Sequence, residues 1–114
     1  MNPLACRCFD PQAARSAFFV QPVGIDTTHQ RFGDVSLWTC QQCGTRWLHY
    51  LVEYEAFTAS GRWFRGLILS APRETPIPSA AIAYLEGLPW YFLGGSYFGS
   101  TGMRGAGKIQ ADLY

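Results

Sequence analysis

The sequence predicts an α+β fold, in which one or two short helices pack on a small antiparallel sheet. Its 114 residues are enough for one core and too few for two ordinary domains. Residues 35–40 and 45–55 are rich in β-branched and aromatic side chains and flank a tight turn, which predicts a hairpin. Residues 79–86 carry the start and stop signals of a short helix. Together these observations favour a sheet with helical additions.

The N-terminal part of the chain permits two interpretations. Asp10 followed by Pro11 is a typical helix start, and the helix would have an apolar face of three alanines and one phenylalanine. Alternatively, residues 17–20 form a strand that ends near Pro22. The hydrophobic pattern does not decide between the two. Residues 24–34 are polar and rich in turn-forming residues, which predicts a loop.

The second strand of the predicted hairpin is amphipathic. Alternate residues of its sequence are apolar and share one face, namely Leu48, Tyr50, Val52 and Tyr54. The opposite face mixes aromatic, aliphatic, histidine and acidic side chains, so we expect it to be only partly covered. Residues 62–69 follow a turn and predict a third strand, antiparallel to the second.

The C-terminal third is expected to contain a helix and then a tail. Ser79 can cap the helix, Gly87 ends it and Pro89 prevents its return. From residue 99 onward the chain is rich in glycine and poor in apolar side chains. We therefore expect one domain over residues 1–98 and a flexible tail over residues 99–114.

The four cysteines form two close pairs, Cys6 with Cys8 and Cys40 with Cys43. Zn²⁺ prefers four tetrahedral ligands, and two thiolates separated by two residues on a sharp turn can both reach one ion without strain. Gly44 permits the positive φ that such a turn needs. We therefore predict one structural Zn²⁺ that is held by all four cysteines and stabilises the domain.

The C-x2-C-G pattern within residues 38–47 resembles the zinc knuckle of zinc-ribbon proteins. The first pair has C-x-C spacing in place of the ribbon's usual C-x2-C, and thirty-one residues separate Cys8 from Cys40, more than in a minimal ribbon. The resemblance therefore implies a ribbon-like metal site within a larger fold. Iron is an alternative metal that the ligand pattern does not exclude.

Three other interpretations of the chemistry are weaker. A redox-active C-x2-C pair should begin a helix, whereas residues 45–55 have the pattern of a strand. A catalytic zinc needs an open coordination position, for which His29 and His49 are the available histidines. The segment from Gly102 to Lys108 fits the phosphate-loop pattern G-x4-G-K, but isoleucine follows where a Mg²⁺-binding serine or threonine should be. We therefore do not expect an enzyme.

Charge and hydropathy limit the setting in which the protein acts. Eight arginines and one lysine face eight acidic residues, for a formal net charge of +1. Nucleic-acid-binding domains are usually strongly basic, so long-range attraction to phosphate is expected to be weak. The sequence has no run of the ~20 apolar residues that span a bilayer and no signal-peptide core near Met1. We therefore expect a cytoplasmic protein, in which thiols favour metal over disulfides.

The abundance of Trp, Tyr and Arg, which are enriched in interface hot spots, suggests a non-enzymatic zinc-stabilised protein-binding module, such as an adaptor, an inhibitor or a toxin-neutralising immunity-type protein. The candidate partner-binding residues, each of which also suits a core, are Trp63, Trp90, Tyr91, Tyr97 and Phe98. The alternative is a zinc-ribbon-like nucleic-acid-binding protein, and a zinc enzyme is a third possibility. The alternative requires phosphate contacts from Arg46, Arg62, Arg65 and Arg104.

Overall fold

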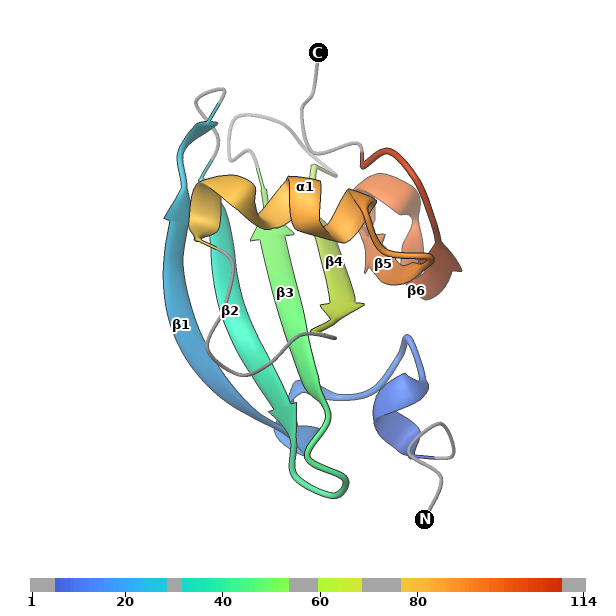
Figure 1. Ribbon diagram of the computed structural model, residues 1–114. Helices are drawn as coiled ribbons and strands as arrows, with labels where there is room; N and C mark the ends of the chain where they lie inside the picture. Colours follow the sequence, from blue (N-terminus) through green and yellow to red (C-terminus); the bar gives the residue numbers. More distant parts are fainter. Residues whose placement is uncertain (1–5, 29–31, 54–59, 69–76, 110–114) are drawn as a thin grey trace.

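The computed structural model describes residues 6–28, 32–53, 60–68 and 77–109, and its main feature is a six-stranded antiparallel sheet (Figure 1). The strands lie in the sheet in the same order as in the chain, and each pairs antiparallel with the next. Their bounds are β1 (Phe18–Asp26), β2 (Gly33–Cys40), β3 (Arg46–Val52), β4 (Arg62–Leu67), β5 (Tyr91–Gly95) and β6 (Ser100–Gly105).

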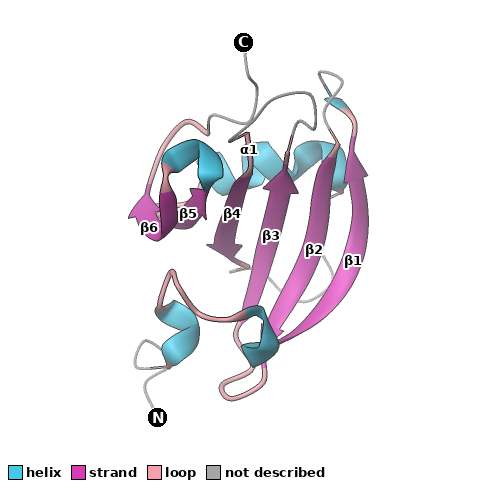
Figure 2. Ribbon diagram, turned by 180° about the vertical axis from the view of Figure 1, so that it is seen from behind, coloured by secondary structure: helices cyan, strands magenta, loops and turns pink. Residues whose placement is uncertain are grey.

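The two faces of the sheet are covered differently. The helix α1 (Ala81–Glu86), preceded by the 3-10 turn η5 (Pro78–Ala80), lies across one face. The N-terminal segment, with the 3-10 turns η2 (Arg7–Phe9) and η3 (Arg15–Ala17), lies over the lower part of the other face, as Figure 2 shows from behind. We call the first the helix face and the second the open face.

The predicted α+β class is wrong, because the described residues are dominated by strands. Their helical content is one α-helix of six residues and four 3-10 turns, including η6 (Ser96–Phe98). The N-terminal helix does not form. Instead, the Asp10 carboxylate accepts a hydrogen bond from the amide of Gln12 at 2.9 Å, which favours a turn over a helix. Phe18 then begins β1, where its ring packs on Trp38 with centroids 5.1 Å apart.

Strand β1 is longer than predicted and continues through Pro22 to Asp26. Because β1 is an edge strand, the missing amide hydrogen of Pro22 need not break a ladder on both sides. The pairing register with β2 shifts between Pro22 and Gly24, so a bulge accommodates the proline and the glycine. The predicted loop at 24–34 is therefore shortened to the connection between Asp26 and Gly33.

The apolar side of β3 faces α1, as predicted. Leu48, Tyr50 and Val52 are buried there together with Val35, Phe64, Ala81, Leu85 and Tyr91. The Tyr50 hydroxyl donates to the Asp26 carboxylate at 2.6 Å, which joins β3 to the edge strand across the core. Tyr54, the fourth residue of the predicted face, lies outside the described residues.

The glycine-rich segment after residue 99 forms a strand, although its composition predicts a flexible tail. Residues Ser100–Gly105 pair with β5 as β6. A Cβ atom on Gly102 would clash with the carbonyl oxygen of Pro11, so glycine permits a close approach between β6 and the N-terminal segment. Composition alone cannot distinguish this use of glycine from chain flexibility.

Arg65 fastens the N-terminal segment to the open face. Arg65 is 1% exposed, and its guanidinium donates to the carbonyl oxygens of Cys8, at 2.7 Å, and Asp10, at 2.9 Å. It also lies over the ring of Trp47, 4.3 Å from the centroid, and 5.0 Å from the centroid of Phe18. Burial lowers the pKa of Arg65 to about 10, so the side chain stays charged at neutral pH.

Replacing Arg65 with lysine is expected to destabilise the protein by about 3 kcal/mol. Lysine keeps the charge but cannot bond both carbonyls with a planar fork, and its ammonium is more strongly hydrated. Denaturant unfolding measures the change. The matched control is Arg104→Lys, since Arg104 is exposed and lies over Trp90. Equal stability of the two variants would contradict the anchoring role.

Candidate functional site

The turn between β2 and β3 has the geometry of a metal knuckle. Cys40 ends β2, its amide bonds the carbonyl of Thr45 at 2.8 Å, and its carbonyl accepts from the amide of Gly44 at 3.0 Å. Gly44 has a φ of 76°, the positive value for which a glycine is suited. The amide of Gln42 approaches the Cys40 sulfur at 3.4 Å. The backbone therefore turns both cysteine side chains to the same side.

The predicted convergence of the two cysteine pairs is confirmed. The Sγ atoms of Cys6, Cys8, Cys40 and Cys43 all lie within 4.8 Å of one another. Cys6 is 3.6 Å from Cys40 and Cys8 is 3.5 Å from Cys43, sulfur to sulfur. A tetrahedral ion with metal–sulfur bonds of about 2.3 Å places its ligand sulfurs about 3.8 Å apart. The four sulfurs therefore fit one metal ion and are too far apart for disulfides, whose bonds are about 2 Å long.

The electrostatics of the cluster differ from one sulfur to the next. Burial, reinforced by the neighbouring thiol of Cys43, raises the pKa of Cys8 well above its ordinary value, while Trp47 acts in the opposite direction. Burial also opposes ionisation of Cys43, but hydrogen bonding to Thr45 outweighs it and lowers the pKa of Cys43 to about 6. The Thr45 hydroxyl lies 3.0 Å from that sulfur. A divalent cation would replace the protons of such a cluster.

The indole nitrogen of Trp47 also favours ionised thiols in the cluster. It is buried, and within the described residues it has no hydrogen-bond partner. Its influence on Cys8 favours the thiolate, which is the form that binds metal. The donor set and its surroundings thus fit a metal held by four thiolates. Such closed sulfur sites are typical of structural rather than catalytic ions.

The two histidines do not complete a catalytic metal site in the part of the chain that is described. His49 lies on β3 and is absent from the sulfur cluster. His29 lies outside the described residues. The described ligands therefore leave no nitrogen donor beside the four sulfurs.

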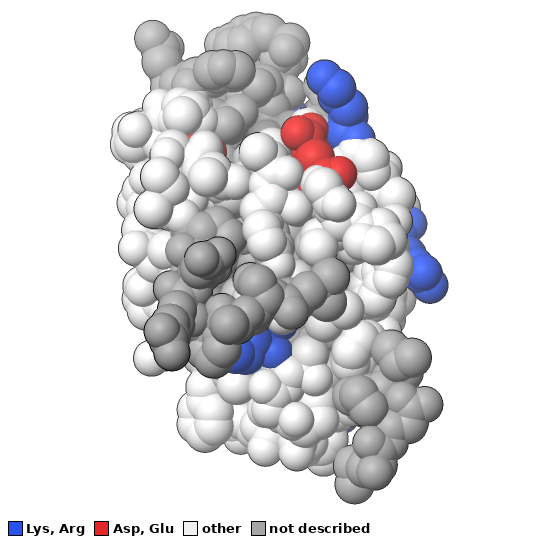
Figure 3. All heavy atoms as spheres, viewed as in Figure 1, with Lys and Arg blue, Asp and Glu red and all other residues white. Residues whose placement is uncertain are grey.

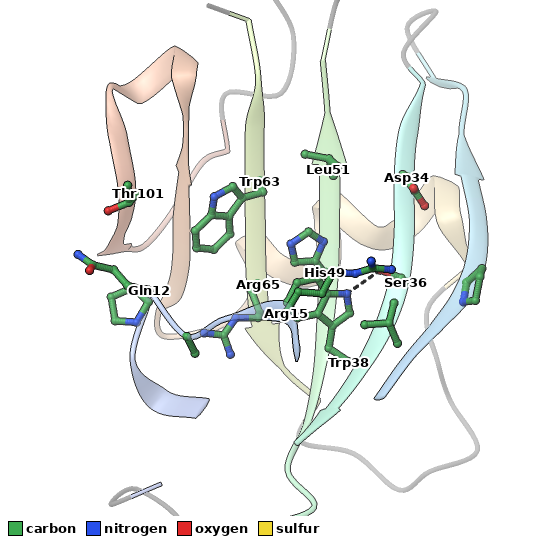
Figure 4. A pocket seen from close by; sticks show the side chains of 14 residues that line it. Gln12, Arg15, Asp34, Ser36, Trp38, His49, Leu51, Trp63, Arg65 and Thr101 are labelled. Atoms are coloured by element: carbon green, nitrogen blue, oxygen red, sulfur yellow. Dashed lines mark hydrogen bonds between the residues drawn. The ribbon is translucent and has the colours of Figure 1, made fainter. Parts of the chain in front are cut away.

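The open face contains a cavity of about 520 Å³ above β2, β3 and β4 (Figure 4). The N-terminal segment lines it from Pro11 to Arg15, and Val20 and Pro22 of β1 line it as well. The sheet contributes three aromatic side chains, Trp38, His49 and Trp63, and polar side chains from Asp34, Ser36 and Arg65. A cavity of this size falls in the range of small-ligand sites.

His49 is stacked between two tryptophans. Its ring centroid is 4.0 Å from that of Trp38, with the planes 6° apart, and 5.9 Å from that of Trp63, with the planes 13° apart. Burial, together with the positive charges of Arg65 and Arg15, lowers the pKa of His49 to about 3. The imidazole is therefore neutral at physiological pH, with one nitrogen that donates and one that accepts.

The candidate partner-binding aromatics occupy different parts of the molecule. Trp63 is half-buried and lines the cavity. Trp90 is half-buried in the aromatic cluster beside the metal centre, 6.2 Å from Trp47 between centroids. Tyr91 is 2% exposed, so its predicted place on an exposed surface is wrong. Phe98 packs edge-on against Phe64, and the side chain of Tyr97 lies outside the described residues.

Two of the arginines proposed to contact phosphate are buried. Arg62 is fully buried and Arg65 is 1% exposed, so neither can reach a nucleic-acid backbone. On the helix face, the described Lys and Arg side chains lie apart from one another (Figure 3). Arg46 is half-buried and Arg104 is exposed, which leaves two of the four predicted contacts.

Trp38, His49 and Arg15 belong to one site that the sequence did not predict. The alternation along β2 and β3 is a signal for two of them, since Trp38 and His49 then share the face opposite the apolar core. Arg15 carries no such signal, because it lies in the 3-10 turn η3 rather than in a strand. Its place depends on how the N-terminal segment folds back.

Comparison of the chain with protein-family models, with curated proteins and with solved structures found no match. Among the described residues, no helix is long and apolar enough to cross a membrane.

Removing the metal with a chelator is expected to release the N-terminal segment and to destabilise the protein strongly. Binding of a structural zinc contributes on the order of 10 kcal/mol to the folding of small domains. Elemental analysis should find one ion per chain, and the thermal melt and circular dichroism should change when the ion is removed and recover when it is returned. An unchanged melt after verified removal would exclude a structural ion.

Stability is expected to fall by about 1.4 kcal/mol between pH 7.5 and pH 5.5 through His49 alone. The folded pKa of about 3 lies below the ordinary value of 6.5, so in this range only the unfolded chain binds the proton. Acidification therefore favours unfolding. Urea unfolding at the two pH values measures the change in stability. His49→Gln should reduce that change by the amount given above, while the contribution of the cysteine thiols stays, and His29→Gln should leave it intact. Equal pH dependence of the wild type and His49→Gln would be inconsistent with a buried neutral imidazole.

Proposed function

We propose that this protein is a non-enzymatic binding module, stabilised by one Zn²⁺ at the four cysteines, that binds a protein partner on its open face. Such a module would act as an adaptor, an inhibitor or an immunity-type protein. The observation that carries the proposal is the aromatic cavity on the open face, which is bounded on one side by the segment that begins with the metal centre.

The donor set supports a structural role for the metal. All four ligand atoms are sulfurs, Cys8 and Cys40 are buried, and the cluster joins the start of the chain to the turn after β2. Zinc favours this tetrahedral set and brings no redox chemistry. Metal content and the visible absorption spectrum distinguish it from iron, which the same sulfurs can hold.

The surface around the cavity supports a macromolecular partner. Ile25 of β1 is 50% exposed and Leu51 of β3 is 42% exposed. Ile25 pairs with Asp34, and Asp34 pairs in turn with Leu51, so the three residues share one row of the open face. Two exposed apolar side chains on either side of Asp34, next to a cavity lined by tryptophans, resemble the mixture of aromatic, apolar and charged residues found at protein interfaces. On the helix face, α1 covers the core.

Leu51→Arg is expected to weaken capture of the partner at least tenfold, because a charge would replace an apolar contact beside the cavity. Ala83→Arg on the exposed side of α1 is the matched control and should capture as much as the wild type. The zinc-loaded proteins are immobilised, exposed to native cell lysate and compared by quantitative mass spectrometry. The proposal fails if the wild type captures no stoichiometric protein, or if Leu51→Arg captures the same protein equally well.

A further inference from the structure

The cavity on the open face contains a buried polar group without a partner. His49 is 8% exposed, and within the described residues neither ring nitrogen has a hydrogen-bond partner. The flanking indoles of Trp38 and Trp63 hold the ring plane, and Figure 4 shows the imidazole between them on the floor of the cavity. The imidazole N–H is therefore available to a ligand in the cavity that supplies an acceptor.

Further donors lie around His49. Ser36 accepts a hydrogen bond from the indole N–H of Trp38 at 2.9 Å, which leaves its own O–H free to donate. Arg15 reaches the cavity from the N-terminal segment, and its guanidinium has no hydrogen bond or ion pair among the described residues. Arg65 adds a second positive charge beneath the floor. The donors outnumber the acceptors, and the charge near His49 is positive.

The rest of the cavity is mostly apolar. Its apolar lining includes Val20, Pro22, Leu51 and the indole of Trp63. Asp34, the acidic residue of the lining, lies on β2 at a distance from Arg15 (Figure 4). Its negative charge disfavours a second anionic group in that part of the cavity. A ligand that fits this cavity therefore has one anionic group joined directly to an apolar group.

We propose that the cavity binds a carboxylate carried on an apolar group, with Arg15, Ser36 and His49 bonding the carboxylate and Leu51 and Trp63 covering the apolar part. A planar guanidinium suits a carboxylate because it can donate two parallel hydrogen bonds. Two sources supply this chemistry: a free aliphatic or aromatic monocarboxylic acid, and the C-terminal residue of a protein chain that ends in an apolar side chain. The second source rests on the proposed function, since it places a terminus of the partner in the cavity.

The test uses the zinc-loaded full chain and two matched pairs of probes. The first pair is 3-phenylpropionate and its neutral amide. The second is a short peptide that ends in leucine with a free carboxylate and the same peptide with a C-terminal amide. Binding is measured by calorimetry and by the imidazole resonances of His49 in two-dimensional nuclear magnetic resonance.

In at least one pair, the acid should bind at least tenfold more tightly than the amide and should shift the His49 resonances. Arg15→Gln should lower the affinity for the acid at least tenfold. Arg7→Gln, an exposed control on the same segment, should leave that affinity unchanged. If 3-phenylpropionate binds more tightly than the peptide acid, the cavity is a small-molecule site. If the peptide acid binds more tightly, the ligand is the C-terminus of a protein chain. His49→Phe keeps an aromatic ring between the two indoles but removes the hydrogen bond to the carboxylate, so it should also lower the affinity for the acid.

Equal affinity for acid and amide in both pairs would overturn the proposal, as would equal affinity of Arg15→Gln and Arg7→Gln for the acid. No detectable binding of any probe at millimolar concentration would also overturn it. These results are independent of partner capture. If Leu51→Arg loses the captured partner but no carboxylate binds, the proposed function is supported and the carboxylate site is excluded. If a carboxylate binds but no protein is captured, only the small-molecule site is supported.

Discussion

The buried guanidinium of Arg65 is the interaction on which the metal centre and the open-face cavity both depend. It holds the carbonyls of Cys8 and Asp10, and the aromatic rings beneath it replace part of its lost hydration. The first carbonyl belongs to a cysteine of the cluster, and the second directly precedes the stretch that lines the cavity from Pro11. One side chain from the middle of the sheet therefore positions two sites that are built largely by the start of the chain.

The metal centre and Arg65 act on the same short segment by different means. A metal ion at the cluster would join the sulfurs of Cys40 and Cys43 to those of Cys6 and Cys8, while Arg65 bonds the backbone that follows. This division explains how a segment with two 3-10 turns and little regular structure can line a cavity. A segment without its own hydrogen-bonded ladder needs such external ties, because its local structure supplies little stability.

Local patterns predicted the centre of the sheet and the sulfur cluster well. The alternation of apolar residues in β3 follows from the two-residue period of a strand, and the knuckle follows from C-x2-C-G. The errors lie where packing decides. Pro22 is tolerated because β1 is at the edge, and β6 uses Gly102 for close packing against Pro11. A single sequence does not show which strand lies at the edge of the sheet or which glycine packs against another segment.

The sequence by itself determined the four cysteines of the cluster and the strands around residues 35–67, because cysteine spacing and side-chain alternation are properties of neighbouring residues. Only the tertiary structure decided the roles of Arg65, His49 and Arg15. Their charge states and contacts depend on burial and on groups from distant parts of the chain: the Cys8 carbonyl for Arg65, the Trp38 and Trp63 rings for His49, and the sheet beneath Arg15. An isolated arginine or histidine in a sequence carries no information about such neighbours.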